Sequence, residues 1–331
     1  MKKKIALLAA AAVVIITVIA LAVILPKTTE KSFFAMNTVC TAKIKSTDSK
    51  NDADKIESIV SGLEENVLSR QNENSLTARL NSNGGGEIDE KMGGYLSVLL
   101  DVCKKSGGSF DFTLGEVSDI WGFGAETAVP NPYVLYNALK RTGYEKLSVT
   151  GYSVNYTDSF IVDFGAAGKG IALDEIRSYL DESETKEAVV SVGGSILLYG
   201  EKDFSVGIRN PEGNAGSYVA ILNIPEGCVS TSGGYERYFE EDGKIYHHII
   251  DPETGYPAES GVVSVTVVSE SGILSDALST ACFVLGIEKG AALAAEYGCE
   301  TVFIDENKTV FVSDGLTDRI EITDAAYSLA E

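Results

Sequence analysis

Two adjacent histidines, His247 and His248, are the only histidines in the chain and the first candidates for acid–base chemistry. They precede Asp251-Pro252, which leads into a turn that Gly255 completes. The imidazole group is the side chain best suited to proton transfer near neutral pH. Neighbouring side chains on a strand point in opposite directions, so only one of the two histidines can easily face a given cleft. The alternative is a pair that is exposed or hydrogen-bonded within the core.

A carboxylate and a hydroxyl follow at helical spacing. Asp276 and Thr280 are four residues apart, which places both side chains on one face of a helix. Their oxygens are hard ligands of the kind that Mg²⁺ takes, with phosphate oxygens and water completing the coordination. The pair is therefore a candidate magnesium site. The alternative is an Asp that interacts with the helix macrodipole and a Thr that is merely exposed.

Small-residue loops could bring the backbone close to a ligand. The segment 163–170 begins with Asp163, contains Lys169, follows a predicted strand and opens a predicted helix. Its free N–H groups and Lys169 could bind a phosphate, although an ordinary strand-to-helix turn with a solvated lysine fits as well. The segments 192–195 and 230–234 are two further loops of this kind. Aromatic residues between 107 and 124 could stack on a ring system, but packing in the core is their first interpretation.

The elements that would position these groups are an irregular mixture of helices and strands. The segment 26–32 is interpreted as a polar linker, and 33–44 as a strand that Met36-Asn37-Thr38 interrupts. Periodicity predicts an amphipathic helix at 52–69. Further helices are expected at 168–180, 275–285 and 288–297, and strands at 300–304 and 309–313. Asp242-Gly243 predicts a hairpin turn. The mixture favours an α+β fold. The sequence contains neither a Rossmann nor a P-loop nucleotide-binding motif.

The first segment differs in kind from the rest of the chain. Met1–Lys4 contains three lysines, and Ile5–Leu25 is an apolar run with Thr17 as its only polar side chain. Roughly 20 helical residues cross a bilayer, so the run is long enough to span it. The lysines should stay in the cytoplasm. We therefore expect a membrane anchor at 1–26 and an extracytoplasmic domain at 27–331, with a cleaved signal peptide as the alternative.

The composition restricts the partners of that domain. The 331-residue chain has 44% hydrophobic residues, enough for the core of one large domain or two fused lobes. Without the three lysines at 2–4, 24 basic residues remain against 48 acidic ones, a formal charge of −24. Such a charge would repel a phosphate backbone, which argues against nucleic-acid binding. Five scattered cysteines without CxxC spacing are interpreted as buried thiols.

Taken in chain order, these segments resemble the ApbE family, the FAD:protein FMN transferases. The resemblance runs from about Met36 to Gly286 and rests on a series of motifs: Met36-Asn37-Thr38, Gly107–Gly115, Trp121–Gly124, Asp163–Gly170, Gly193-Gly194, Thr231-Ser232-Gly233, His248–Pro252 and Asp276–Thr280. It implies an α+β fold of two lobes with mixed and antiparallel sheets and flanking helices. FAD would lie in the cleft between the lobes, and one transmembrane helix would precede them.

The resemblance also implies a reaction. Mg²⁺ would be bound by Asp276, Thr280 and the carbonyl of Gly168, and would bridge the FAD pyrophosphate. His248 would be the general base for a Thr or Ser hydroxyl of an acceptor flavoprotein, which attacks the FMN phosphorus and expels AMP. The catalytic residues would thus be His248 and Asp276. The residues implied for FAD binding are Met36, Asp111, Trp121, Asp163, Lys169, Gly193, Gly194, Thr231, Ser232, His248 and Asp251.

Three positions depart from the family pattern. Asn37 replaces the usual Gly, Gly168 replaces the usual Ala, and Gln71 stands where many relatives have an aromatic residue near the flavin. The last departure keeps a second activity open, hydrolysis of FAD to FMN and AMP. An anchored flavin-binding protein without turnover is the third hypothesis.

Overall fold

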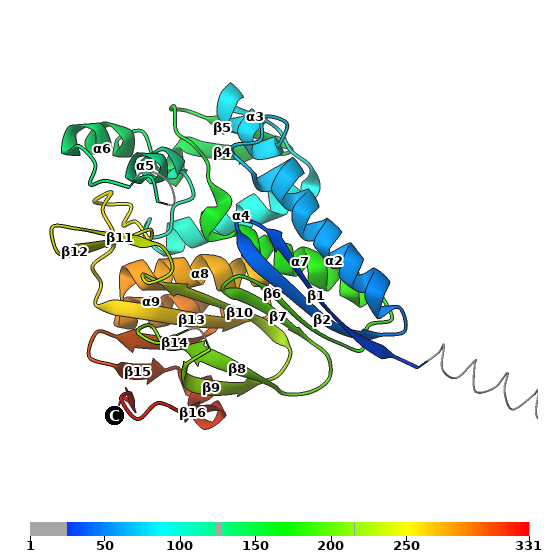
Figure 1. The fold of residues 1–331 in the computed structure, drawn as a ribbon. Helices are drawn as coiled ribbons and strands as arrows, with labels where there is room; N and C mark the ends of the chain where they lie inside the picture. Colours follow the sequence, from blue (N-terminus) through cyan, green and yellow to red (C-terminus); the bar gives the residue numbers. More distant parts are fainter. Residues whose placement is uncertain (1–24, 124–126, 215, 331) are drawn as a thin grey trace, which may run out of the picture.

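The structure of the chain, a computed structural model, describes residues 25–123, 127–214 and 216–330 (Figure 1). The predicted anchor lies almost entirely outside these residues, as does Gly124 of the Trp121–Gly124 motif. None of the helices within the described ranges is long and apolar enough to cross a membrane.

A nine-stranded sheet forms the centre of the molecule (Figure 1). Its neighbouring strands pair antiparallel, except for the parallel pair of the last two, so the sheet is mixed. The central strands are buried along nearly their whole length because both faces of the sheet are covered. In order across the sheet, the strands are β1 (Lys27–Ala35), β2 (Thr38–Ser46), β6 (Glu187–Val192), β7 (Ser195–Tyr199), β10 (Gly227–Gly233), β13 (Val262–Ser269), β14 (Glu300–Asp305), β15 (Thr309–Val312) and β17 (Ser328–Leu329).

Helices cover one face of this sheet and a small sheet covers the other. On the helical side lie α2 (Ser49–Leu63), α7 (Gly168–Glu182), α8 (Gly272–Leu285) and α9 (Ile287–Glu296) (Figure 1). On the opposite side is a three-stranded sheet of β8 (Phe204–Arg209), β9 (Tyr218–Ile224) and β16 (Ile320–Ile322). Alternate side chains of β14 pack into the two layers on either side of the sheet. Val302 and Ile304 pack toward the small sheet, and Phe303 packs toward the helices.

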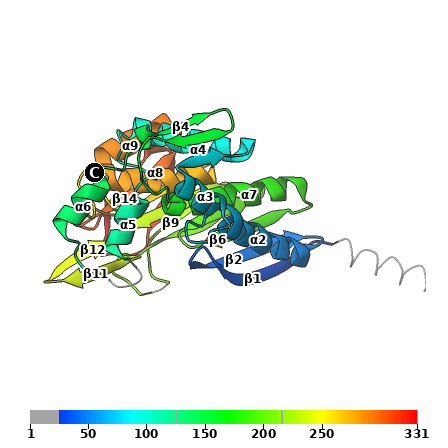
Figure 2. The same cartoon turned by 90° about the horizontal axis from the view of Figure 1, so that it is seen from above.

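Two smaller groups of elements complete the described chain. The first contains α3 (Leu76–Asn83), α4 (Glu90–Lys105) and a sheet of β3 (Gly85–Glu87), β4 (Leu147–Thr150) and β5 (Ser153–Tyr156). The second contains α5 (Gly115–Trp121), α6 (Pro132–Leu139) and the hairpin β11 (Tyr238–Glu241) and β12 (Lys244–His247). Figures 1 and 2 show the members of the second group side by side. They surround Trp121 with an apolar cluster of their own.

The α+β prediction is confirmed, as are the hairpin at Asp242-Gly243 and the buried thiols. The single interrupted strand at 33–44 was wrong. Met36 and Asn37 have positive φ angles of 50° and 58°, and they form the two-residue turn of the β1–β2 hairpin. The segment interpreted as a linker is mostly β1 itself, which reads as polar because it is an edge strand. A turn of this type favours Asn or Gly, and Met36 gave no turn signal. The helix predicted at 52–69 is α2 followed by a π-helical turn, η1 (Glu64–Leu68).

Candidate functional site

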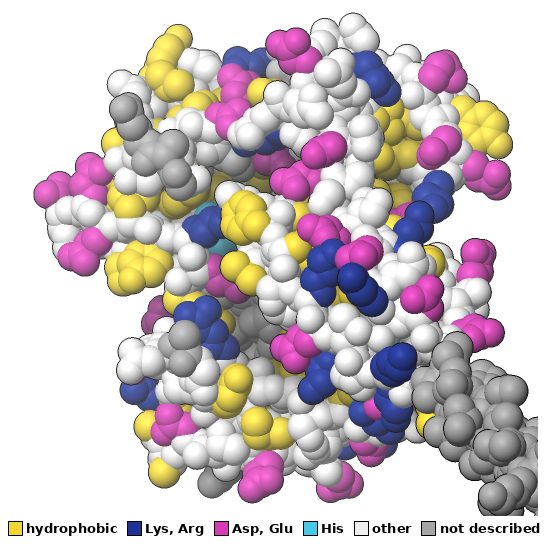
Figure 3. Space-filling view, turned by 45° about the vertical axis from the view of Figure 1, so that its right-hand side comes forward, with side chains coloured by type: hydrophobic (Ala, Val, Ile, Leu, Met, Phe, Trp, Pro, Cys, Tyr) yellow, Lys and Arg dark blue, Asp and Glu magenta, His cyan; other side chains and the backbone are white. Residues whose placement is uncertain are grey.

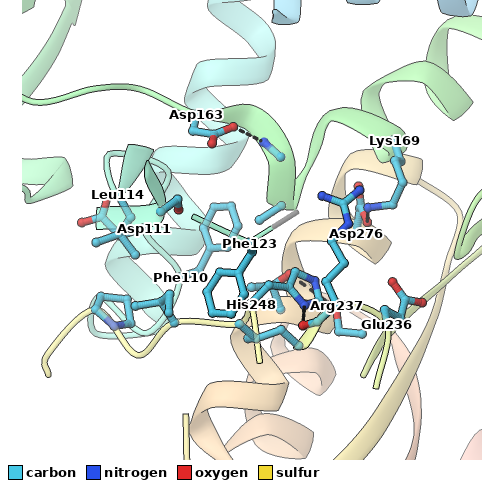
Figure 4. A pocket seen from close by; sticks show the side chains of 18 of the residues that line it. Phe110, Asp111, Leu114, Phe123, Asp163, Lys169, Glu236, Arg237, His248 and Asp276 are labelled. Carbon is cyan, nitrogen blue, oxygen red and sulfur yellow. Dashed lines mark hydrogen bonds and ion pairs between the residues drawn. The ribbon is translucent and has the colours of Figure 1, made fainter. Parts of the chain in front are cut away.

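A cavity of about 400 Å³ lies between the sheet-and-helix body and the α5–β12 group (Figure 4). On one side it is lined by residues of and near α5, including Ser118, Asp119 and Phe123. On the other side it is lined by Thr231, Ser232, Asp276 and Thr280. An adjoining cavity of about 320 Å³ shares Arg70, Gln71, Asp163, Gly165, Lys169, Glu236, Arg237 and His248 with it. Volumes of this size suit a small-molecule ligand.

The carboxylate of Asp276 is held at the cavity by donors from two other elements. The residue is only 4% exposed. Its Oδ2 accepts a hydrogen bond from the N–H of Gly170 at 2.9 Å, and its Oδ1 accepts one from Ser195 Oγ at 3.1 Å. The Nζ of Lys169 lies 3.4 Å from Oδ1. These contacts fix the orientation of the carboxylate and compensate its burial.

Two glycines allow these contacts to form. A Cβ on Gly170 would lie 2.2 Å from the carbonyl oxygen of Gly272, and a Cβ on Gly272 would lie 2.4 Å from that of Gly170. Any side chain at either position would therefore force α7 away from α8. The close crossing brings the first turn of α7, with Lys169, against the first turns of α8, with Asp276. Gly170 belonged to the predicted phosphate loop, but its role in helix packing was not predicted.

Hydroxyl groups of β10 lie along α8 beside Asp276. Ser232 Oγ is 2.8 Å from Ser279 Oγ and 3.5 Å from Thr280 Oγ1, and Ser230 Oγ is 2.8 Å from Ser275 Oγ. Asp276 and Thr280 thus line the same cavity, as their spacing predicted, while Gly168 lines the adjoining one. Within residues 25–123, 127–214 and 216–330, no three His, Cys, Asp or Glu side chains gather as a metal site. A metal here would need neutral oxygens as ligands.

His248 faces the cavity and His247 does not. The backbone N–H of His248 donates to the carbonyl oxygen of Arg237 at 3.0 Å, and Nδ1 lies 3.2 Å from the same oxygen. A carbonyl only accepts, so Nδ1 carries the proton and Nε2 is left as a free base. Burial, together with the positive charges of Arg237 and Lys169, lowers the pKa of His248 to about 4. The ring is therefore neutral at pH 7.

His247 has a structural position. Its Nε2 lies 3.1 Å from the carbonyl oxygen of Ala258, and its ring meets the ring of Phe283 edge-on at 5.4 Å. Burial lowers its pKa as well. The opposite orientations of the two histidines follow from the alternation of side chains at the end of β12.

Trp121 and Asp251 do not line the cavity; both support it. Trp121 is fully buried, donates from Nε1 to the carbonyl oxygen of Gly255 at 2.8 Å, and stacks on Phe123 at 5.7 Å. Gly122 and Phe123, the next two residues of this motif, line the cavity. Asp251 accepts a hydrogen bond from the N–H of Glu253 and organises the turn that precedes Gly255. Trp121 therefore packs in the core, as its first interpretation had it, and does not line the cavity as the family resemblance implied.

The other residues implied for FAD binding all line one of the two cavities. Asp111 lines the main cavity, where it accepts hydrogen bonds from the N–H groups of Thr113 and Tyr144. The remaining ones are Thr231 and Ser232 in the main cavity, Met36, Gly193 and Gly194 in the adjoining one, and Asp163 and Lys169 in both.

Four charged residues that line the main cavity were not predicted: Arg70, Asp119, Glu236 and Arg237. Arg70 forms ion pairs with Asp163 at 2.9 Å and with Asp119 at 2.6 Å, and so joins opposite sides of the cavity. Glu236 and Arg237 follow the small-residue loop at 230–234 and line both cavities. Their place directly after that loop was the one available signal. Figure 3 shows acidic side chains scattered among basic ones over one face of the molecule, in keeping with the acidic composition.

Comparison with known proteins identifies the family of the chain. Residues 36–303 match the model of the ApbE family. The chain belongs to the ApbE family. A FAD:protein FMN transferase of Treponema pallidum is 36% identical over 291 residues, which cover 80% of each chain. One of Escherichia coli K12 is 29% identical over 293 residues, or 83% of this chain and 84% of that one.

Solved structures of ApbE proteins share the fold. An ApbE protein of Thermotoga maritima superimposes with a TM-score of 0.79 at 30% identity, covering 87% of this chain and 98% of that chain. The flavin transferase ApbE of Vibrio cholerae superimposes with a TM-score of 0.78 at 24% identity, which shows the α+β fold alone. The ApbE architecture predicted from the motifs is therefore confirmed.

Proposed function

We propose that this chain is a FAD:protein FMN transferase, which moves FMN from FAD to a Thr or Ser hydroxyl of an acceptor protein and releases AMP. The relatives from T. pallidum and E. coli, each aligned over about four-fifths of its length, carry this name. The single observation that carries the proposal is the placement of His248 and Asp276. They come from separate elements, and they line one cavity together with Lys169.

FAD would occupy the two joined cavities, between the lobe built on the large sheet and the α5–β12 group. Lys169 supplies positive charge for the pyrophosphate. Phe110 and Phe123 line the main cavity and offer flat apolar surface for a ring system. Gln71 lines both cavities, so the position that departs from the family pattern is in reach of the ligand.

The residues at Asp276 fit a hard divalent cation such as Mg²⁺. The donor set consists of a buried carboxylate, the hydroxyl of Thr280 and the carbonyl of Gly168, all oxygen ligands of the kind that Mg²⁺ takes. With one carboxylate in the set, phosphate oxygens of FAD would supply further negative charge. When bound, the ion would offset charge on the pyrophosphate and draw electron density from the bond that breaks.

We infer that His248 transfers the proton in this reaction. Its Nε2 takes the proton of the acceptor hydroxyl, and that oxygen forms a bond to the phosphorus of the FMN half of FAD. The bond from this phosphorus to the bridging oxygen breaks, and AMP leaves with the electron pair. The product is an FMN phosphodiester on the acceptor. Positioning and charge neutralisation supply most of the catalysis in phosphoryl transfer.

Residues 1–26 would anchor the enzyme in the membrane, with the catalytic domain outside the cytoplasm. The support is the sequence: an apolar run of spanning length preceded by three lysines. Alkaline carbonate extraction of membranes that contain the full chain tests this. An anchor keeps the chain in the pellet, whereas a cleaved signal peptide releases a shortened chain.

Incubation of the full chain with FAD, Mg²⁺ and a candidate acceptor protein tests the activity. Transfer gives an acceptor with the added mass of FMN and an equal amount of AMP. Free FMN with AMP would instead show hydrolysis, and unchanged FAD would show binding alone. Replacement of the acceptor Thr or Ser by Ala is the control, because it removes the attacking hydroxyl and leaves FAD binding intact.

A further inference from the structure

Among the described residues, Arg237 is the one Lys or Arg of the main cavity that forms no ion pair with a carboxylate. Three basic residues line the main cavity. Arg70 is held by Asp119 and Asp163, and Lys169 lies 3.4 Å from Asp276. Throughout the described chain, by contrast, Arg237 has no carboxylate oxygen within ion-pair distance. Its guanidinium is therefore available to an anionic ligand, which the other two cations are not without breaking a contact.

Both the side chain and the main-chain carbonyl of Arg237 act at the cavity. The side chain lines both cavities, and Figure 4 shows it extending from beside His248 toward the part of the cavity where Lys169 and Asp276 lie. The carbonyl oxygen of Arg237 accepts from both the backbone N–H and Nδ1 of His248. Arg237 directly precedes β11 and His248 directly follows β12, so the guanidinium and the expected base are held together at the base of one hairpin.

A planar guanidinium is well matched to phosphate. It binds two phosphate oxygens at once, which a lysine ammonium cannot do. In phosphoryl transfer, cations directed at the phosphoryl oxygens stabilise the charge of the transition state. The side chain of Arg237 is exposed and can reach a ligand in the cavity, while its main-chain carbonyl holds the imidazole of His248. Here the two functions coincide at one residue.

We propose that Arg237 is a further catalytic residue, whose guanidinium binds the phosphate being transferred and whose main-chain carbonyl positions the imidazole of His248. The inference rests on the proposed FMN transfer. In that reaction the acceptor proton goes to Nε2 of His248 and the electron pair of the broken bond leaves with AMP. Arg237 forms no covalent bond. It holds the phosphate oxygens next to the base, and its charge adds to the burial that lowers the pKa of His248.

Substitution of the side chain separates its two effects, since any residue keeps the carbonyl. Arg237→Gln removes the charge, and Arg237→Lys keeps the charge but loses the two-pronged contact. Arg79→Gln is the matched control, because Arg79 is exposed on α3 and bonds only a backbone carbonyl. The full chain is assayed with FAD, Mg²⁺ and an acceptor protein, with kcat and KM for FAD measured from pH 4 to 9.

The expected loss lies in kcat. Arg237→Gln should lower kcat by about 10²–10³-fold, the usual effect of removing one preorganised donor, with a much smaller change in KM. Arg237→Lys should recover part of the loss, and Arg79→Gln should match wild type. Unchanged kcat in Arg237→Gln would overturn the proposal. So would equal losses in the Gln and Lys variants, because these would indicate disturbed packing.

The titration of His248 gives a readout that does not depend on turnover. The charged or titratable groups that act on its ring are Arg237, Lys169 and His247, and each lowers its pKa. NMR of the imidazole in the protein without FAD should therefore show a higher pKa in Arg237→Gln than in wild type or Arg237→Lys. If the pKa does not rise, the proposed effect of Arg237 on the base is refuted. If it rises while wild type transfers no FMN, the proposed function fails and the coupling of these two residues stands.

Discussion

The crossing of α7 and α8 makes Gly170→Ala the most informative single substitution. The new Cβ would lie 2.2 Å from the carbonyl oxygen of Gly272 and 2.7 Å from Cβ of Asp276. Ordinary contacts between such atoms are about 3.5–4.0 Å, so the two helices must separate by roughly 1 Å or more. The N–H of Gly170 bonds Oδ2 of Asp276 at 2.9 Å, and that bond would be stretched beyond its useful range.

The size of the effect follows from two opposing terms. Ala gains up to about 1 kcal/mol over Gly in a helix interior, less in the first turn where Gly170 lies. Overpacking costs about 1–3 kcal/mol, and weakening a hydrogen bond to a carboxylate costs about 1.5–3 kcal/mol more. The net loss of unfolding free energy should be about 2–6 kcal/mol. Displacing Lys169 from Asp276 by about 1 Å should also lower kcat, by up to about 10²-fold.

Gly94→Ala is the matched control. Gly94 lies exposed inside α4, and a Cβ there meets no atom within 4 Å. It should raise the free energy of unfolding by about 0.5–1 kcal/mol and leave transfer unchanged. The assay is thermal unfolding of the full chain, followed by FMN transfer well below the midpoint of each variant. If Gly170→Ala keeps both the wild-type midpoint and the wild-type rate, the contact between these helices does not position the site.

The remaining predictions concern the site directly. Asp276→Asn should abolish the turnover that depends on magnesium, and calorimetric titration with Mg²⁺ in the presence of FAD should show weaker binding of the ion. Undiminished affinity for Mg²⁺ would refute the assignment of Asp276 as a metal ligand. His248→Ala should lower transfer about 10²–10⁴-fold, as loss of a general base does, while His247→Gln keeps most of it; similar losses in both would contradict the assigned base. Because the pKa of His248 is lowered to about 4, the rate of transfer should fall as the pH drops through about 4 and not through 6.5; a limb of the kcat/KM profile near pH 6.5 would contradict this. The free energy of unfolding should decrease as the pH falls from about 6.5 to about 4, because His248 takes up a proton in the unfolded chain before it does so in the folded one. Trp121→Phe should lower the free energy of unfolding by about 1–3 kcal/mol, because it leaves the carbonyl of Gly255 unpaired; unfolding in denaturant measures it, and no change would show that water satisfies that group.

Patterns within single elements were predictable from the sequence. The spacing of Asp276 and Thr280 placed both on one face of α8, and adjacency in a strand separated the orientations of His247 and His248. Both follow from the local periodicity of helix and strand, which needs no knowledge of the rest of the fold. The motif series added the order of the segments around the cavity.

Contacts between distant segments were not predictable in the same way. Arg70 reaches Asp119 and Asp163 over 49 and 93 residues of chain, and nothing in the local sequence marks an arginine for two partners. Gly170 meets Gly272 across the helix crossing, and each glycine alone looks like an ordinary loop residue. The turn at Met36-Asn37 was missed for a related reason. A positive φ at Met is unfavourable in isolation, and the surrounding hairpin enforces it.

Contacts between distant segments of the chain matter for function because they determine the distance between the two sides of the cavity. The α5–β12 side has an apolar cluster around Trp121, and the α8 side belongs to the largest cluster of the molecule. Apolar periodicity can predict each cluster, because burial is roughly proportional to apolar area and has no direction. It cannot predict the distance between two clusters that meet across a polar cavity. That distance depends on directional contacts such as the ion pair of Arg70 with Asp119, so the width available to a ligand is set by residues whose partners only the folded chain reveals.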